Sequence, residues 1–167
     1  MIKYTLAFIK RNNELLMLNR IKAPTMGIWN GVGGKIEKDE LPIQSIQREI
    51  EEETGIKVKL EDIKEKGLVT WKDEKGTIGG MYLFLATIDA NLSYNTPLQT
   101  EEGILDWKKI EWVLSKENRG VGELIPIFLH KVIHENESFH YSTTYEGNFL
   151  KEVQIEKIVN NEMVMIP

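Results

Sequence analysis

The chain has 167 residues, the length of one ordinary domain, and 41% of them are hydrophobic. Its formal charge of -5 argues against a broad basic surface for nucleic acid, because that mode of binding depends on Lys and Arg neutralising phosphates. The absence of cysteine excludes disulfides, thiolate metal sites and cysteine nucleophiles. Residues 1–15 carry no signal-peptide pattern and no segment reaches the roughly 18 apolar residues of a membrane span, so we expect a cytoplasmic protein without a membrane partner.

The first elements in chain order are two apolar runs of strand length, Tyr4–Ile9 and Leu15–Arg20. They flank KRNNE, whose paired asparagines tolerate turn conformations, so this segment predicts a β-hairpin. Residues 42–53 then have the apolar spacing of a helix.

Further strands follow the helix. GLVTWKD and GMYLFLATID predict two strands around a glycine-containing turn at residues 74–80, and the alternation in Trp107–Val113 predicts another strand. Residues 121–135 have apolar residues at helical spacing, and residues 139–155 predict a closing hairpin with its turn about residues 146–148. Antiparallel hairpins mixed with helices favour an α/β fold with a mixed sheet.

The helix at 42–53 has two distinct faces. At about 100° per residue one face is apolar, with Ile43, Ile46 and Ile50. A second face about a quarter-turn away carries Glu49, Glu52 and Glu53, whereas Glu51 points elsewhere. Like charges at this spacing cost a few tenths of a kcal/mol per pair, roughly, and a hard divalent cation such as Mg²⁺ offsets that cost. The alternative is a solvated acidic face, the usual meaning of a charge run.

Glycine and acid positions before and within this helix follow a fixed spacing. From Gly34 the order is five residues, Glu40, seven residues, Arg48-Glu49-Ile50, one residue, Glu52-Glu53, one residue and Gly55-Ile56. This pattern over residues 34–56 resembles the Nudix box, the signature of the Nudix hydrolases, at each defined position. The resemblance implies a single Nudix domain over residues 1–167 with an α/β/α sandwich fold and a mixed sheet. It also implies that Mg²⁺ or Mn²⁺ helps to cleave the pyrophosphate link of a nucleoside diphosphate derivative.

The resemblance assigns roles within this segment. Glu49, Glu52 and Glu53 match the metal ligands of the family, and Glu49 or Glu53 is the candidate to take a proton from water. Gly33 matches a position whose carbonyl oxygen is a ligand, with a plain turn glycine as the alternative. The remaining positions are expected to be structural: Gly34 permits close approach of the backbone, Arg48 pairs with the carboxylates, Glu40 supports the loop and Gly55 ends the helix.

Similarity outside residues 34–56 indicates which branch of the family this sequence resembles. YTLAFI, WNGVGGKI, TEEGILDWKKIEWV and FHYSTTYEGNFLKEV look like the MutT-type 8-oxo-dGTP diphosphatases, especially the human-type oxidised purine triphosphatases. By that likeness Thr5 and Asn30 fall at base-pocket positions, Arg20 replaces a pocket lysine, and Glu102 matches a late-loop carboxylate near the metal. The human-type enzymes carry a Trp and paired aspartates before the last helix. Here the matching stretch NRGVGELIP has Asn118, Gly120 and Val121, so we expect weaker selection of the oxidised base.

Two aromatic features have alternative interpretations. His130 and His134 have the i, i+4 spacing of a Zn²⁺ site, but no third ligand lies nearby in sequence and packing histidines are commoner. Trp29 lies next to the glycine loop, where it either stacks on a base or anchors the loop in the core.

The expected function is hydrolysis of a nucleoside triphosphate to its monophosphate and pyrophosphate. Dinucleoside polyphosphates, nucleotide sugars and RNA 5′ ends remain alternative substrates, and a nucleotide sensor that binds without cutting is the rival class. The expected partner is a small nucleotide rather than duplex nucleic acid, and the chain is expected to be a monomer or a homodimer.

Overall fold

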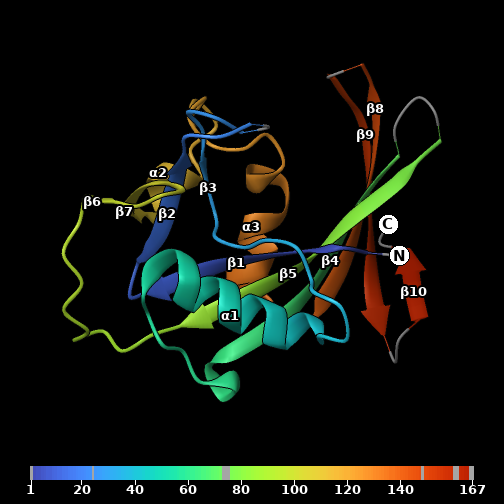
Figure 1. The fold of residues 1–167 in the computed structure, drawn as a ribbon. Helices are drawn as coiled ribbons and strands as arrows, with labels where there is room; N and C mark the ends of the chain where they lie inside the picture. Colours follow the sequence, from blue (N-terminus) through green and yellow to red (C-terminus); the bar gives the residue numbers. More distant parts are fainter. Residues whose placement is uncertain (1, 24, 73–75, 148, 160–161, 166–167) are drawn as a thin grey trace.

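The computed structural model describes residues 2–23, 25–72, 76–147, 149–159 and 162–165 (Figure 1). The strands are β1 (Tyr4–Arg11), β2 (Glu14–Arg20), β3 (Trp29–Asn30), β4 (Ile63–Lys72), β5 (Ile78–Thr87), β6 (Leu98–Gln99), β7 (Gly103–Lys109), β8 (Ser138–Glu146), β9 (Phe149–Val159) and β10 (Glu162–Met165). The helices are α1 (Pro42–Thr54), α2 (Ile110–Val113) and α3 (Ile125–His134), with a 3₁₀ turn, η1, at Leu60–Asp62. No helix in these ranges is both long enough and apolar enough to cross a membrane.

All the strands join one mixed sheet. Their order is β10-β9-β8-β4-β5-β1-β2-β7-β6, and β3 pairs with β2 beside this path. The pairs β1–β5 and β4–β8 are parallel, whereas the hairpin pairs β1–β2, β4–β5 and β8–β9 are antiparallel. The three predicted hairpins are therefore confirmed, together with the mixed character of the sheet. Residues 74–75 and 148 of the predicted hairpin turns lie outside the described residues, as does residue 73 at the end of the predicted strand before the first turn. That first turn was predicted too long, because residues 78–80 belong to β5.

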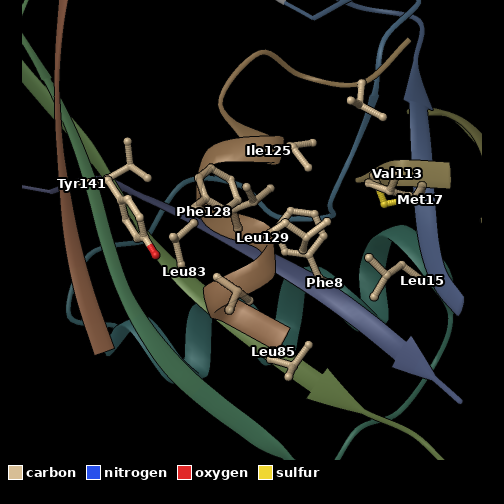
Figure 2. Close-up of a cluster of buried hydrophobic side chains, with 14 of the residues drawn as sticks. Phe8, Leu15, Met17, Leu83, Leu85, Val113, Ile125, Phe128, Leu129 and Tyr141 are labelled. Carbon is tan, nitrogen blue, oxygen red and sulfur yellow. The ribbon is translucent and has the colours of Figure 1, made fainter. Parts of the chain in front are cut away.

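Alternating side chains of the central strands supply two cores, one on each face of the sheet. Phe8, Leu15 and Met17 belong to the core covered by α3, whereas Ala7 and Ile9 belong to the core covered by α1. Figure 2 shows the first core, where the Phe8 and Phe128 ring centroids are 5.9 Å apart. Figure 1 shows α1 and α3 on opposite faces of β1 and β5, which is the layered α/β/α arrangement.

One sequence prediction was wrong in part. The strand predicted at Trp107–Val113 ends at Lys109, and residues 110–113 form the short helix α2. The reason is that its partner β2 begins at Glu14, which pairs with Lys109, so that no strand remains for residue 110 to join. The Ile110 N–H instead donates to the Asn13 carbonyl oxygen, and Leu114 N–H donates to the Ile110 carbonyl oxygen.

Candidate functional site

A glycine loop is pressed between strand β1 and helix α1. The oxygens of Val32 and Gly34 accept hydrogen bonds from the N–H groups of Ala7 and Thr5, so pairing with β1 uses the carbonyls on either side of Gly33. A Cβ on Gly33 would lie 2.2 Å from the Thr5 carbonyl oxygen, at a φ of +150°. A Cβ on Gly34 would lie 2.4 Å from Oε1 of Glu49. Gly33 therefore requires glycine because its neighbour is backbone, whereas the neighbour of Gly34 is the end of the Glu49 side chain.

Helix α1 presents its acidic residues above this loop. Pro42 stands at its start, Gly55 ends it with a φ of 72°, and the Gly55 N–H donates 2.8 Å to the Glu51 carbonyl oxygen. Ile46 and Ile50 are fully buried against the sheet, which confirms the predicted apolar face. The helix is thereby fixed in rotation, so its carboxylates have a defined direction.

Arg48 ties three carboxylates together. Its Nε and Nη2 donate to the two oxygens of Glu40 at 2.9 and 3.0 Å, a bidentate pair. Its Nη1 donates to Glu49 Oε1 at 2.8 Å and to Glu52 Oε2 at 2.9 Å. Glu40 also accepts the Glu37 N–H at 3.0 Å, and the Arg48 hydrogen bond holds the pKa of Glu40 below its ordinary value. Arg48 and Glu40 are thus bound to each other, and their role as supporting residues stays a prediction.

Glu53 is the most perturbed acid of the cluster. Burial raises its pKa from 4.5 to about 7, and the charges of Glu49 and Glu102 act in the same direction. The Gly33 N–H, which donates 3.1 Å to Glu53 Oε2, and the charge of Arg20 oppose the increase. Glu102 arrives from the loop before β7, and its carboxylate contacts Lys22 at 2.7 Å. The fold thus brings together acids from two distant segments, and a cation is the species that relieves their repulsion.

The acids are not arranged as a ready-made metal site. Within the described ranges no three His, Asp or Glu side chains form a cluster with that geometry. One oxygen each of Glu49 and Glu52 is held by Arg48, and Glu102 is held by Lys22. Hard oxygen donors around a repelling cluster nevertheless suit Mg²⁺ or Mn²⁺. A metal ion therefore requires these side chains to reorient from their present partners.

Two cavities meet at the acids. The large cavity, of about 820 Å³, is lined at this end by Glu49, Glu53, Glu102, Gly33, Gly34, Arg20 and Lys35. The acidic cavity, of about 500 Å³, is lined by Glu49, Glu52, Glu53, Thr54, Gly55, Thr100, Glu101 and Glu102. Glu49, Glu53 and Glu102 border both cavities, whereas the side chain of Glu52 is 60% exposed and borders only the acidic cavity.

The large cavity is also lined by residues with polar side-chain atoms that are available for hydrogen bonds to a ligand. Thr5 Oγ1 and Arg20 Nε are buried and have no hydrogen-bond partner among the described residues, and both residues line the cavity. Asn30 lines it too, and its Oδ1 accepts the Gly31 N–H at 2.9 Å, which leaves its Nδ2 group as a donor near Gly122. Buried polar groups are normally paired, so these atoms indicate a site shaped for a polar ligand.

A family model for the NUDIX domain matches residues 3–128. The chain belongs to the Nudix family. This finding confirms the resemblance carried by residues 34–56, and the Nudix fold agrees with the α/β/α layers and mixed sheet. The match ends within α3, so β8, β9 and β10 lie beyond it.

The Nudix relatives include MutT-type proteins. The chain is 39% identical over 57 residues to the CTP pyrophosphohydrolase of Escherichia coli, covering 34% of this chain and 42% of that protein. It is 41% identical over 49 residues to the 8-oxo-dGTP diphosphatase of Proteus vulgaris, covering 29% and 44%. It thus matches less than half the length of either. The MutT protein of Bacillus halodurans superposes with a TM-score of 0.75 at 25% identity, over 91% of this chain and 95% of that one.

The structure bears on the alternative interpretations of Trp29 and of the pair His130 and His134. Trp29 packs against the core beside α3, and Lys108 Nζ lies 4.2 Å from its ring centroid, which favours an anchoring position over base stacking. The His130 and His134 rings lie 4.7 Å apart, but the described residues hold no cluster of three metal-binding side chains around them.

Several residues of the large cavity were missed by sequence reasoning. Among them are Trp71, Glu123 and Tyr145, which line the cavity together with Met81, Leu124, Ile125 and Phe128. Glu123 belongs to the NRGVGELIP stretch, in which only Asn118, Gly120 and Val121 were considered as residues that could contact the base. Its position two residues before α3 was the signal in the sequence that could have indicated it. The paired aspartates are absent there, but a carboxylate does border the cavity.

Proposed function

We propose that this Nudix domain is a metal-dependent pyrophosphohydrolase that converts a nucleoside triphosphate to its monophosphate and pyrophosphate. The observation that carries the proposal is the convergence of Glu49, Glu53 and Glu102, from a helix and a distant loop, where two cavities meet. The activities named for the MutT-type relatives agree with it.

The proposed metal ligands are Glu49, Glu52, Glu53 and Glu102 with the Gly33 carbonyl oxygen. A bound Mg²⁺ or Mn²⁺ would polarise phosphoryl oxygens and lower the pKa of water. Arg48 keeps Glu49 and Glu52 directed toward one another, and Glu53 is positioned by the Gly33 N–H. These contacts order the carboxylates, and metal binding would require Glu49 and Glu52 to exchange a hydrogen bond from Arg48 for the ion.

The hydrolytic step requires a group that accepts the proton of the water and groups that bind the nucleotide. Water attacks a phosphorus atom of the substrate's triphosphate and a new P–O bond forms there. The P–O bond between the nucleoside monophosphate and the pyrophosphate breaks. Glu49 and Glu53 are the candidates to accept the proton of the water, since both border the two cavities. Thr5, Arg20 and Asn30 offer polar atoms to the nucleotide in the large cavity.

The proposal is tested with a panel of nucleotides in Mg²⁺, scored for pyrophosphate against orthophosphate. We expect monophosphate and pyrophosphate in equal amounts, no turnover in EDTA, and poor replacement of Mg²⁺ by Zn²⁺ because the site consists of hard oxygen donors. Orthophosphate with diphosphate left behind would indicate a simple phosphatase. Tight nucleotide binding without any product would indicate a sensor, and faster cleavage of nucleotide sugars or dinucleoside polyphosphates would change the substrate class.

A further inference from the structure

Lys22 forms an ion pair with one of the proposed metal ligands. Its Nζ lies 2.7 Å from Oε1 of Glu102, and Nη2 of Arg20 lies 3.9 Å from Oε2 of the same carboxylate. Glu102 borders both cavities, so the Lys22 ammonium lies at the place where they meet. The Lys22 side chain is 57% exposed, and an ion pair this exposed contributes little to stability. Another partner can therefore replace either member of the pair at little cost.

The backbone keeps Lys22 beside Glu102. Strands β2 and β7 are antiparallel neighbours, and their register ends with Arg20 opposite Gly103 (Figure 1). The pairing continues for one more step, because the Ile21 N–H donates 3.1 Å to the Glu102 carbonyl oxygen. Lys22 is the next residue. If the side-chain bond from Lys22 to Glu102 is broken, this backbone bond still keeps the ammonium near the border of the two cavities.

The turn that carries Glu102 is held more firmly than the Lys22 side chain. The Thr100 N–H donates 2.7 Å to the Gly103 carbonyl oxygen, and Thr100 Oγ1 accepts the N–H groups of Glu102 and Gly103 at 3.2 Å. A Cβ at Gly103 would lie 2.0 Å from the Asn19 carbonyl oxygen, so the turn is pressed directly against β2. Glu102 thus has a fixed backbone position, and the exposed Lys22 side chain is the member of the pair that is free to move.

Lys22 and a divalent cation compete for the same carboxylate. Glu49, Glu53 and Glu102 border the same two cavities, so a cation held by these acids would repel the Lys22 ammonium. If Glu102 binds the cation, Lys22 loses its partner. An ammonium group binds phosphate oxygens well, as a compact point charge. Lys22 would then exchange a carboxylate for the phosphates of the nucleotide that enters the same place.

We propose, on the basis of the proposed function, that Lys22 is a phosphate-binding residue that pairs with Glu102 until a metal ion binds there. Before that, Lys22 neutralises Glu102 and so weakens metal binding. Afterwards, Lys22 donates to phosphate oxygens of the substrate. The same ammonium therefore opposes the metal ion and favours the phosphate groups. Removing its charge should change the two affinities in opposite directions.

Both affinities are measured without turnover. Mn²⁺ is titrated into wild type, Lys22→Met and Lys22→Arg, and free Mn²⁺ is followed by electron paramagnetic resonance. Inorganic pyrophosphate is titrated by calorimetry into the same proteins at saturating Mg²⁺. We expect Lys22→Met to bind Mn²⁺ about threefold to tenfold more tightly, because one nearby positive charge is removed. It should bind pyrophosphate about tenfold more weakly, because one charge-assisted hydrogen bond is lost.

Two variants serve as controls. Lys22→Arg keeps the positive charge, so both affinities should stay within about twofold of wild type. Lys57→Met removes the same charge from the segment that follows α1, where Lys57 is 83% exposed and pairs with Glu51 at 3.3 Å. Its affinities should also stay within about twofold, because Glu51 lines neither cavity. A shift equal to that of Lys22→Met would mean that only net charge matters, which would overturn the inference.

The outcomes separate this inference from the proposed function. Unchanged affinities in a folded Lys22→Met protein, or changes of both in one direction, would leave Lys22 as an ordinary surface ion pair and overturn the inference. If Lys22→Met does not fold, Lys22→Gln, which stays polar, takes its place. A wild type that binds neither Mn²⁺ nor pyrophosphate rejects the inference together with the proposed function. Opposite changes in a protein that hydrolyses no nucleotide reject only the proposed function.

Discussion

The backbone N–H of Gly33 donates a 3.1 Å hydrogen bond to Oε2 of Glu53, a residue 20 positions later in the chain. This bond joins the glycine loop to the last turn of α1. It stabilises the charged form of Glu53, but burial and the charges of Glu49 and Glu102 outweigh it, so the pKa of Glu53 rises to about 7. The carboxylates of the cluster therefore repel one another.

The raised pKa predicts a pH-dependent stability in EDTA. The folded protein binds the Glu53 proton more tightly than the unfolded chain, whose value is 4.5, so the stabilising contribution is complete below pH 4.5. It is lost as pH rises through about 7. The loss amounts to at most about 3 kcal/mol, reduced by solvent screening. Thermal unfolding from pH 4.5 to 8 measures it; Glu53→Gln should flatten the profile and Glu51→Gln should not.

The carboxylates are expected to differ in their effect on turnover. Glu49→Gln and Glu53→Gln should lower kcat by about a hundredfold or more, because these residues border both cavities. Glu102→Gln should give an intermediate defect, since Glu102 comes from a separate loop. Glu52→Gln should also weaken the apparent affinity for Mg²⁺. The effect should be smaller than that of Glu49→Gln, because the side chain of Glu52 is 60% exposed. The measurement is kcat against Mg²⁺ concentration for each variant.

Glu51→Gln is the matched control for this series. Glu51 belongs to the same acidic run, but its side chain is 51% exposed and contacts Lys57 at 3.3 Å. We expect its turnover to stay within a few-fold of wild type. Damage equal to that of Glu53→Gln would mean that the helix acts through bulk negative charge and not through one directed face.

Arg48 is expected to be a structural centre of the loop and helix. Arg48→Ala removes the bidentate pair with Glu40 and the bonds to Glu49 and Glu52, and should cost about 2–4 kcal/mol of unfolding free energy. Arg48→Lys should recover little, because an ammonium cannot reproduce the planar fork. Lys57→Ala, which removes one surface pair, should change stability by less than about 1 kcal/mol. Denaturant unfolding measures all three, and equal effects would contradict the network.

Alanine substitutions at Gly33 and Gly34 should differ in their effects on stability and on turnover. A methyl group at Gly33 meets the Thr5 backbone oxygen, so Gly33→Ala should destabilise the fold itself. A methyl group at Gly34 meets the Glu49 carboxylate, a side chain that is able to rotate, so Gly34→Ala should keep more stability but lose turnover. Melting temperature and kcat for the two variants test this contrast. A Gly34→Ala protein with normal turnover would show that the position of Glu49 is not critical.

Local patterns were sufficient for much of the fold. The apolar runs of β1 and β2 flank asparagines that turn the chain, and Ile46 and Ile50 fix the buried face of α1, so both elements were predictable from spacing alone. The end of β7 was not predictable in this way. Trp107–Val113 alternates throughout, but β2 provides no partner beyond Glu14, and a strand cannot continue without one.

The sequence by itself determined the acidic face of α1, the glycines beside it and the Nudix family, because these features depend on residues within one short segment. Only the tertiary structure decided that Glu123, Trp71 and Tyr145 share a cavity with Glu49, Glu53 and Glu102. Glu123 comes from the turn before α3, and Trp71 and Tyr145 come from β4 and β8, two strands that parallel pairing places side by side. Such contacts follow from the order of strands in the sheet, which no local spacing of residues encodes.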